Sequence, residues 1–255
     1  MTTIAMQTQG LVKRFGGLLV TDSVSLDLRQ GELHAVIGPN GAGKTTLINQ
    51  LTGELFSDQG EIMFGGRPIT SLPISERARL GLLRSYQITS IFEEFSVLEN
   101  VVLAAMGAKE HGFYFWKPLL SWGRHVQTAN DALKITNLVD RAQACAAELA
   151  YGERRQLELA MALAAKPQVL LLDEPMAGMS PQESADVIEM LKRLKKTHSI
   201  LLIEHDMDAV FALADRITVL VYGKVLRTGT PDEIRNDPEV KSVYLGDEIT
   251  EQAAT

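Results

Sequence analysis

Hydrophobic and polar residues alternate near the start of the chain. Over residues 6–37 the alternation is interrupted by turn sequences at Gly16-Gly17 and Gln30-Gly31. This pattern predicts antiparallel strands joined by tight turns. Residues 60–70 follow the same pattern and predict a further hairpin of that sheet.

The pattern changes in the middle of the chain. Between about 74 and 150 apolar residues follow mostly helical spacing, with a break from Gly107 to Gly123. Beyond residue 168, short apolar runs alternate with amphipathic stretches, which predicts a parallel sheet covered by helices. The expected strands are Val169–Leu172, Ser199–Ile203 and Ile217–Val221, and the expected helices lie near 181–196 and 207–214.

The end of the chain contains two sharp helix starts. Residues 230–233, Thr-Pro-Asp-Glu, form a capping box with proline at the first helical position, and Pro238 marks a second start. Together the patterns predict an α/β core with a small β-lobe, an inserted helical lobe and a helical tail.

Composition and charge narrow the classes of function. The chain has 255 residues and a net charge of −7, which argues against nucleic acid as the main partner. Its basic cluster at 192–196 lies on a predicted amphipathic helix and is expected to form the solvent-exposed face of that helix.

The single cysteine, Cys145, excludes an internal disulfide. No secretory signal is visible in residues 1–10, and no apolar run reaches the roughly 18 residues of a membrane span, so we expect a soluble cytoplasmic chain.

Residues 38–45 match the phosphate-binding pattern G-x-x-x-x-G-K-[ST]. Glycines allow a tight turn whose N–H groups point at one anion, Lys44 can reach the outer phosphates, and the Thr45 hydroxyl can hold Mg²⁺. The apolar stretch Leu33–Ile37 precedes the loop, and a predicted helix from Thr46 offers its N-terminus to negative charge. The expected nucleotide-binding residues are Gly38, Pro39, Asn40, Gly41, Ala42, Gly43, Lys44, Thr45 and Thr46.

A second motif follows the apolar run Val169–Leu172, which ends in Asp173-Glu174-Pro175. A strand buried on both faces presents its first polar residues at its carboxyl end, where open α/β sheets bind ligands. We expect Asp173 to hold Mg²⁺ through its water shell and Glu174 to polarise an attacking water molecule.

Residues 149–156, Leu-Ala-Tyr-Gly-Glu-Arg-Arg-Gln, resemble the signature sequence Leu-Ser-Gly-Gly-Gln of ATP-binding cassette (ABC) ATPases. The resemblance covers essentially the whole chain. It implies that two cassettes face each other, so that each signature helix start meets the γ-phosphate held by the partner's phosphate loop. The signature residues are Leu149, Ala150, Tyr151, Gly152 and Glu153.

The resemblance also implies roles for three isolated residues. Phe15 matches the aromatic residue that stacks on adenine, Gln87 the glutamine that binds Mg²⁺ and couples to the membrane partner, and His205 the histidine that contacts the γ-phosphate and orients the water. Catalysis is thereby expected from Glu174, His205 and Lys44, with ATP and Mg²⁺ as ligands. Thr45, Gln87 and Asp173 are the expected metal-site residues.

The implied fold is that of an ABC-type P-loop ATPase. It comprises a RecA-like parallel-sheet core, an antiparallel β-subdomain, an inserted α-helical subdomain and a C-terminal helical tail. We expect a single domain over residues 6–250. Within it, the core and β-subdomain take about 6–86 and 165–228, the helical subdomain with the signature about 88–160, and the tail about 229–250.

Two residues depart from the family pattern. Ala150 replaces the signature serine, and Ser180 replaces an aspartate that normally bridges the two cassettes. A hydrogen bond to a charged group is worth about 1.5–3 kcal/mol, so turnover is expected to fall about ten- to hundred-fold unless backbone donors compensate. Both departures favour an asymmetric pair of cassettes, although pairing with a second copy stays open.

Within the family the chain most resembles the larger ATPase subunit of branched-chain amino acid importers, the LivG type. The likeness rests on residues 87–92, 96–101, 173–179 and the tail 229–240, which leads to Tyr244-Leu245-Gly246. It implies import of branched-chain or other amino acids, amides or small organic acids. The implied partners are transmembrane permease subunits, a second ABC ATPase subunit and, indirectly, an extracytoplasmic solute-binding protein, with the chain held at the cytoplasmic side of the inner or plasma membrane.

Other functions agree less well with the sequence. A lipid or lipopolysaccharide exporter ATPase is the nearest alternative, followed by a soluble ABC ATPase outside transport. A GTPase is disfavoured because no Asn-Lys-x-Asp guanine reader occurs, and a DNA-repair ATPase because Lys44 and Asp173 enclose only a compact lobe. The aromatic cluster at 112–122, with Trp116 and Trp122, predicts either hairpin packing or a surface that docks on the permease or the lipid interface.

Overall fold

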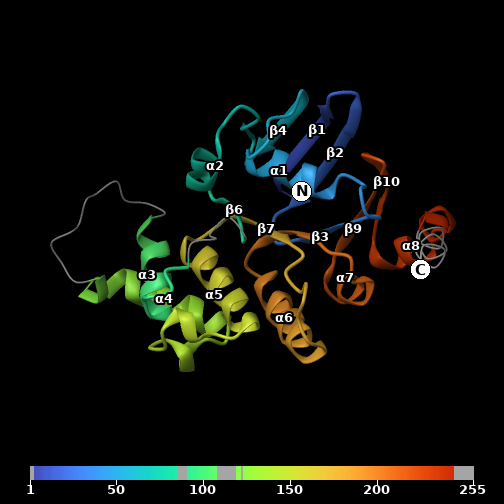
Figure 1. Cartoon of the computed structure of the whole chain (residues 1–255). Helices are drawn as coiled ribbons and strands as arrows, with labels where there is room; N and C mark the ends of the chain where they lie inside the picture. Colours follow the sequence, from blue (N-terminus) through green and yellow to red (C-terminus); the bar gives the residue numbers. More distant parts are fainter. Residues whose placement is uncertain (1–2, 86–90, 108–118, 122, 244–255) are drawn as a thin grey trace.

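The computed structural model describes residues 3–85, 91–107, 119–121 and 123–243 (Figure 1). The strands of this part of the chain form two sheets. One is a four-stranded antiparallel sheet in the order β2-β1-β4-β5. Its strands are β1 (Ile4–Phe15), β2 (Leu18–Arg29), β4 (Gln59–Phe64) and β5 (Arg67–Pro68).

The second sheet is six-stranded, in the order β10-β9-β3-β8-β7-β6. Its strands pair in parallel, except that β10 runs antiparallel to β9. The strands are β3 (Leu33–Ile37), β6 (Leu82–Arg84), β7 (Val169–Asp173), β8 (Ser199–Ile203), β9 (Arg216–Val221) and β10 (Lys224–Gly229). The predicted α/β class with a parallel core and an antiparallel lobe is confirmed.

Two details differ from the sequence prediction. The alternation over 6–37 predicts antiparallel strands throughout, but β3 belongs to the parallel sheet, because all five of its residues are buried. The region from 74 onward was predicted to be mostly helical, yet it contains β6 at the sheet edge. A three-residue strand is too short to show a period.

Helices flank both sheets. They are α1 (Lys44–Thr52), α2 (Ile74–Leu80), α3 (Val97–Gly107), α4 (Gly123–Ile135), α5 (Tyr151–Ala164), α6 (Pro181–Leu194), α7 (Met207–Leu213) and α8 (Pro231–Asn236). Short 3₁₀ turns occur at Leu119–Ser121, Val139–Arg141 and Ala146–Glu148. Helices α3, α4 and α5 pack on one another and form a group at the lower left of Figure 1. Among the helices described, none combines the length and the apolar character needed to cross a bilayer.

The capping box predicted in the tail is present. The Thr230 hydroxyl accepts a hydrogen bond from the Glu233 N–H at 3.4 Å, and the Glu233 carboxylate accepts one from the Thr230 N–H at 2.8 Å. These two bonds start α8 where the sequence places it. Residues 238–243 are also helical, which agrees with the second proline-led start.

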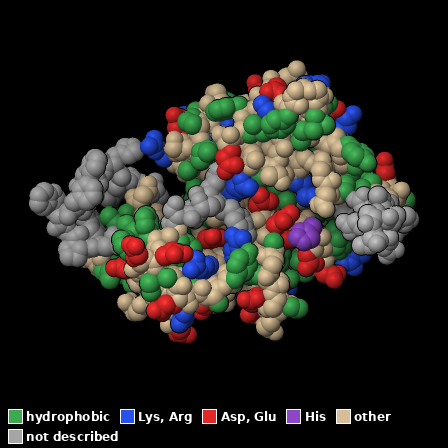
Figure 2. Space-filling model, viewed as in Figure 1, with side chains coloured by type: hydrophobic (Ala, Val, Ile, Leu, Met, Phe, Trp, Pro, Cys, Tyr) green, Lys and Arg blue, Asp and Glu red, His purple; other side chains and the backbone are tan. Residues whose placement is uncertain are grey.

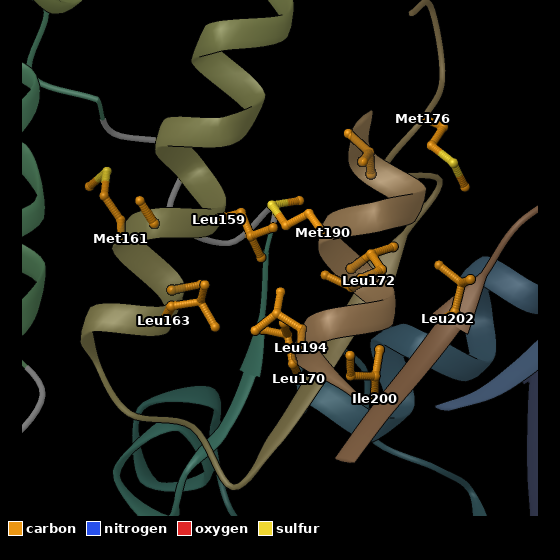
Figure 3. Packing of buried hydrophobic residues seen from close by; sticks show 14 of the residues in the cluster. Leu159, Met161, Leu163, Leu170, Leu172, Met176, Met190, Leu194, Ile200 and Leu202 are labelled. Atoms are coloured by element: carbon orange, nitrogen blue, oxygen red, sulfur yellow. The ribbon is translucent and has the colours of Figure 1, made fainter. Parts of the chain in front are cut away.

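The two faces of the six-stranded sheet bury two separate clusters of apolar side chains. Leu170 and Leu172 of β7 belong to one cluster and Leu171 to the other, since successive side chains of a strand point to opposite faces. Figure 3 shows the first cluster, where Leu159 of α5 and Met190 of α6 lie toward the strands. The second cluster packs α1 against the sheet, through residues such as Leu47, Ile48 and Leu51. The helix that follows the phosphate loop is therefore fixed by the core.

A buried arginine holds the far end of α1. Arg77 of α2 is 1% exposed, and its guanidinium donates hydrogen bonds of 2.7–2.8 Å to four backbone carbonyls. Burial lowers the pKa of Arg77 to about 10, so the group stays charged at neutral pH. A cation is favoured at the C-terminal end of a helix, where carbonyls lack helical partners. The four carbonyls belong to Gln50, Leu51, Thr70 and Leu72.

A polar cluster joins the two sheets at the end away from the phosphate loop. Arg216 of β9 forms ion pairs with Asp27 of β2 at 2.8 Å and with Glu32 at 2.9 Å. Beside it the imidazole of His34 lies 2.9 Å from the carbonyl oxygen of Asp27 and 2.7 Å from the hydroxyl of Thr218. Burial, together with the charge of Arg216, lowers the pKa of His34 to about 4.

The His34 pKa predicts loss of stability in mild acid. An unfolded histidine has its ordinary pKa of 6.5, so between pH 6.5 and about 4 the unfolded chain binds a proton that the folded chain does not. The free energy of unfolding should therefore fall as the pH drops, by about 2 kcal/mol from this group between pH 7 and pH 5. In His34→Gln that loss should be absent, as urea titrations at the two pH values will show. An identical loss in the variant would contradict the assignment.

Candidate nucleotide site

The phosphate-binding pattern lies where β3 passes into α1. Gly43, directly before the helix, has φ 100°, in the left-handed region that favours glycine. A Cβ atom at this position would lie 2.6 Å from the Val20 carbonyl oxygen of β2, so the loop also needs glycine for space. The loop therefore turns tightly under the antiparallel sheet and presents the N-terminus of α1.

Lys44 lies across this loop. Its ammonium group donates hydrogen bonds to the carbonyl oxygens of Gly38 at 2.6 Å and Pro39 at 3.0 Å. Burial lowers the pKa of Lys44, although the carboxylates of Glu174 and Asp173 oppose that change. The ammonium group is thus enclosed by the backbone of the phosphate loop. The carboxylates of Asp173 and Glu174 are near enough to attract its charge.

The second motif ends β7 at the edge of the same loop. Thr45, Asp173 and Glu174 line one pocket of about 350 Å³, together with Arg84, Arg155 and Ala177. Figure 2 shows basic and acidic side chains gathered in the middle of this face, between the antiparallel sheet and the helices. The structure therefore brings together the loop and strand-end residues that the sequence predicts for one site.

Glu174 has an unusual backbone conformation. Its φ of 47° lies in the left-handed region, which costs a non-glycine residue about 1–3 kcal/mol. The Glu174 N–H donates to the Ile203 carbonyl at 2.8 Å, and the side chain is 44% exposed. A carboxylate held in this turn at the pocket rim is open to a water molecule.

His205 lies beside Glu174. Its Nδ1 atom is 3.8 Å from a Glu174 carboxylate oxygen and 3.7 Å from one of Glu204. Glu204 is 1% exposed and accepts hydrogen bonds from the backbone N–H groups of Met176, His205 and Asp206 at 3.0–3.4 Å. Burial raises its pKa, and the three N–H groups oppose that change. Sequence analysis missed Glu204, although it ends an apolar strand just as Asp173 does.

The signature residues begin α5 and pack against their own chain. The Ala150 N–H donates to the Glu153 carboxylate at 2.9 Å, and Gly152 lies against the Glu183 carboxylate of α6, which a Cβ at this position would displace. The Tyr151 hydroxyl donates to the Ala177 carbonyl at 3.4 Å and accepts from Arg155 at 2.9 Å. The start of the signature helix therefore contacts the segment that follows Glu174.

Ser180, which replaces the bridging aspartate of the family pattern, caps α6. Its hydroxyl accepts a hydrogen bond from the Glu183 N–H at 3.4 Å, and the Glu183 carboxylate accepts one from the Ser180 N–H at 2.8 Å. These contacts form a capping box with Pro181 at the first helical position. The serine therefore has a local role in starting a helix.

Of the residues predicted for the nucleotide, Phe15 is not among those that line the pocket. Phe15 ends β1 with 51% of its surface exposed, and the Lys13 ammonium lies 5.8 Å from its ring centroid. An exposed aromatic face is available for stacking. Gln87 lies outside the described residues, as do Trp116 and Trp122 of the aromatic cluster.

The pocket offers the oxygen ligands that Mg²⁺ prefers, since the Thr45 hydroxyl and the Asp173 carboxylate both line it. Within the described ranges no group of three or more histidine, cysteine or acidic side chains could hold a metal. The residues present therefore fit Mg²⁺ that takes its other ligands from nucleotide phosphates and water. Arg84, which the sequence analysis did not single out, lies 2.6 Å from the Asp173 carboxylate.

The fold and the pocket define an ATP-binding cassette, and comparison with known proteins agrees. A sequence model described as ABC transporter matches residues 21–177, and one described as Branched-chain amino acid ATP-binding cassette transporter matches residues 225–250. The chain belongs to the ABC transporter family, as its ATP-binding ATPase subunit. The predicted family is therefore confirmed.

Named relatives extend over nearly the whole chain. The chain is 40% identical to the high-affinity branched-chain amino acid transport ATP-binding protein LivG of Salmonella typhimurium, over 95% of this chain and 98% of that protein. It is 38% identical to BraF of Pseudomonas aeruginosa, with the same coverage. The crystal structure of the ADP conformation of MJ1267, an ATP-binding cassette of an ABC transporter, superposes with a TM-score of 0.85 at 30% identity, covering 96% of this chain and 100% of that one.

Proposed function

We propose that this chain hydrolyses ATP to energise a membrane importer of branched-chain amino acids or related small solutes. The observation that carries the solute class is the tail match over residues 225–250, and the names of the relatives support it. The same tail disfavours a lipid or lipopolysaccharide exporter. We also propose that helices α3–α5 belong to a helical subdomain of about 88–160, between core segments of about 6–86 and 165–228.

In the proposed binding mode, the nucleotide extends from Phe15 to the pocket. Phe15 stacks on adenine, and residues 38–46 wrap the phosphates with backbone N–H groups. Lys44 exchanges its bonds to the Gly38 and Pro39 carbonyls for phosphate oxygens. Burial disfavours the charged form of Lys44 and lowers its pKa. A phosphate placed beside the ammonium group would therefore stabilise that charged form.

Hydrolysis is assigned to the residues at the strand ends. Glu174 accepts a proton from the attacking water, and His205 orients that water and the γ-phosphate. We assign Thr45, Asp173 and Gln87 to hold Mg²⁺. When bound, Mg²⁺ neutralises charge on the β- and γ-phosphates.

The assembly that we propose has two cassettes and a permease. The signature residues 149–153 approach the γ-phosphate bound by the second cassette, which is another copy of this chain or a related subunit. Movement of α3–α5 then reaches the permease through Gln87. The chain lies at the cytoplasmic face of the membrane, and a solute-binding protein acts from the other side.

The experiment that tests this function isolates the chain with its membrane partners. ATP hydrolysis in proteoliposomes should be stimulated by a solute-binding protein loaded with leucine, isoleucine or valine, and labelled solute should accumulate. Co-purification with lipid-export membrane proteins, or hydrolysis that responds neither to these three solutes nor to other amino acids, amides and small organic acids, would contradict the importer assignment.

Ala150→Ser should raise the turnover of the assembled importer about ten- to hundred-fold, because the new hydroxyl adds a phosphate donor at the helix start. Phosphate release by the complex measures the effect. Ala147→Ser is the matched control, since Ala147 is exposed and lies outside the signature. Equal rates for Ala150→Ser and the unmodified chain would show that backbone donors already suffice.

A further inference from the structure

We propose that Arg84 is a positioning residue for the metal-site carboxylate of Asp173. This inference rests on the proposed function, in which Asp173 helps to hold Mg²⁺. The Nη2 atom of Arg84 lies 2.6 Å from Oδ2 of Asp173, and the two side chains are only 11% and 17% exposed. A charge-assisted contact of this length, shielded from solvent, fixes the direction of the carboxylate.

The sheet places Arg84 at this point. β6 pairs in parallel with β7, and Arg84 stands opposite Leu171 in the register. Leu171 and Asp173 are two residues apart on β7 and therefore point to the same face of the sheet, and the long Arg84 side chain on that face can reach Asp173. The position is therefore set by the backbone.

Arg84 also reaches the helix of the phosphate loop. Its Nη1 atom donates to the Asn49 side-chain oxygen of α1 at 2.8 Å and to the Glu54 carboxylate at 3.1 Å. One guanidinium thus links α1, which begins with Lys44 and Thr45, to Asp173 of β7. A lysine has a single nitrogen and cannot present the same fork to both elements.

The contacts of Arg84 fix the distance between the two groups assigned to the metal. Thr45 and Asp173 come from different elements, and Arg84 fixes one element against the other. Because Arg84 binds Oδ2, it also sets the direction in which Oδ1 points. Groups that orient a metal ligand typically change metal affinity by about 10–100-fold when they are removed.

The test measures the affinity of trinitrophenyl-ATP by fluorescence over a range of Mg²⁺ concentrations and in EDTA. Mg²⁺ is expected to raise the affinity for the nucleotide, and the Mg²⁺ concentration that gives half of this increase is the quantity compared. In Arg84→Met this concentration should be about 10–100-fold higher than in the unmodified chain. The affinity in EDTA should change less than about twofold, because Arg84 does not belong to the phosphate loop. Arg84→Lys, which keeps the charge, should show a smaller rise, and it serves as the test if Arg84→Met does not fold.

Two further variants separate positioning from a general structural role. Glu54→Gln keeps the Arg84 contacts with Asn49 and Asp173 and should leave the Mg²⁺ dependence unchanged. In an Asp173→Asn background, Arg84→Met should add no further loss, since Arg84 acts through that carboxylate.

Two results would overturn the proposal, and a third would contradict the metal site itself. Arg84 variants that need the same or less Mg²⁺ would overturn the proposal, because the guanidinium would then be a bystander or a competitor of the cation. Losses that add in the double variant would overturn it as well. An unmodified chain whose nucleotide affinity ignores Mg²⁺ would instead contradict the metal site of the proposed function.

Discussion

Glu174→Gln is expected to keep its affinity for ATP and to lose most of its turnover, about 10²–10⁴-fold. The amide has nearly the shape of the carboxylate but cannot accept the proton of the attacking water. The structure supports this separation of binding from chemistry, because Glu174 lies at the pocket rim while Lys44 lies within the loop. Phosphate release measures turnover, and trinitrophenyl-ATP fluorescence measures affinity.

The control for this variant is Glu189→Gln. Glu189 lies on α6, away from the pocket, in a surface ion pair with Lys192 at 2.8 Å. Exposed pairs of this kind contribute little, so both turnover and affinity should remain as they were. Undiminished hydrolysis in Glu174→Gln would remove Glu174 from the role of base and leave the water to another group.

Arg77→Met should lower the free energy of unfolding by about 3 kcal/mol or more. Methionine fills much of the same volume, but it leaves four carbonyls, two in buried and two in partly buried contacts, without the donors that Arg77 supplies. A buried acceptor without a partner costs about 1–3 kcal/mol, and partial solvation offsets some of the sum. Urea unfolding followed by circular dichroism measures the change.

Arg79→Met is the matched control, since Arg79 lies on the same helix with an exposed side chain. Substitutions at such surface positions usually change stability by less than about 0.5 kcal/mol. Equal stability of the two variants would mean that water replaces the guanidinium at the end of α1.

Sequence patterns predicted those parts of the site in which neighbouring residues carry the signal. The phosphate loop needs glycines, a lysine and a threonine at fixed spacing, and the Asp173-Glu174 pair follows a long apolar run, so both are visible without a structure. Strands β7 and β8 of the six-stranded sheet were predictable for the same reason, because they are continuous apolar runs, whereas the three-residue β6 was not.

Arg84 could not be found in this way, and neither could the contacts of Glu204, although the position of Glu204 after an apolar strand is visible in the sequence. Arg84 has its role because β6 lies beside β7, and the two strands are separated by more than eighty residues of chain. Glu204 acts through backbone N–H groups, one of which belongs to the distant Met176. A single sequence does not show which distant segments meet, so charged residues of this kind look like ordinary surface charges.

The ion pair between β2 and β9 also bears on the proposed binding mode. Asp27 and Arg216 fasten the antiparallel sheet, which carries Phe15, to the parallel sheet, which leads into the phosphate loop. In that binding mode, the base lies on Phe15 and the phosphates lie on the loop. A contact far from the phosphates would then hold in place the two surfaces that one nucleotide has to meet.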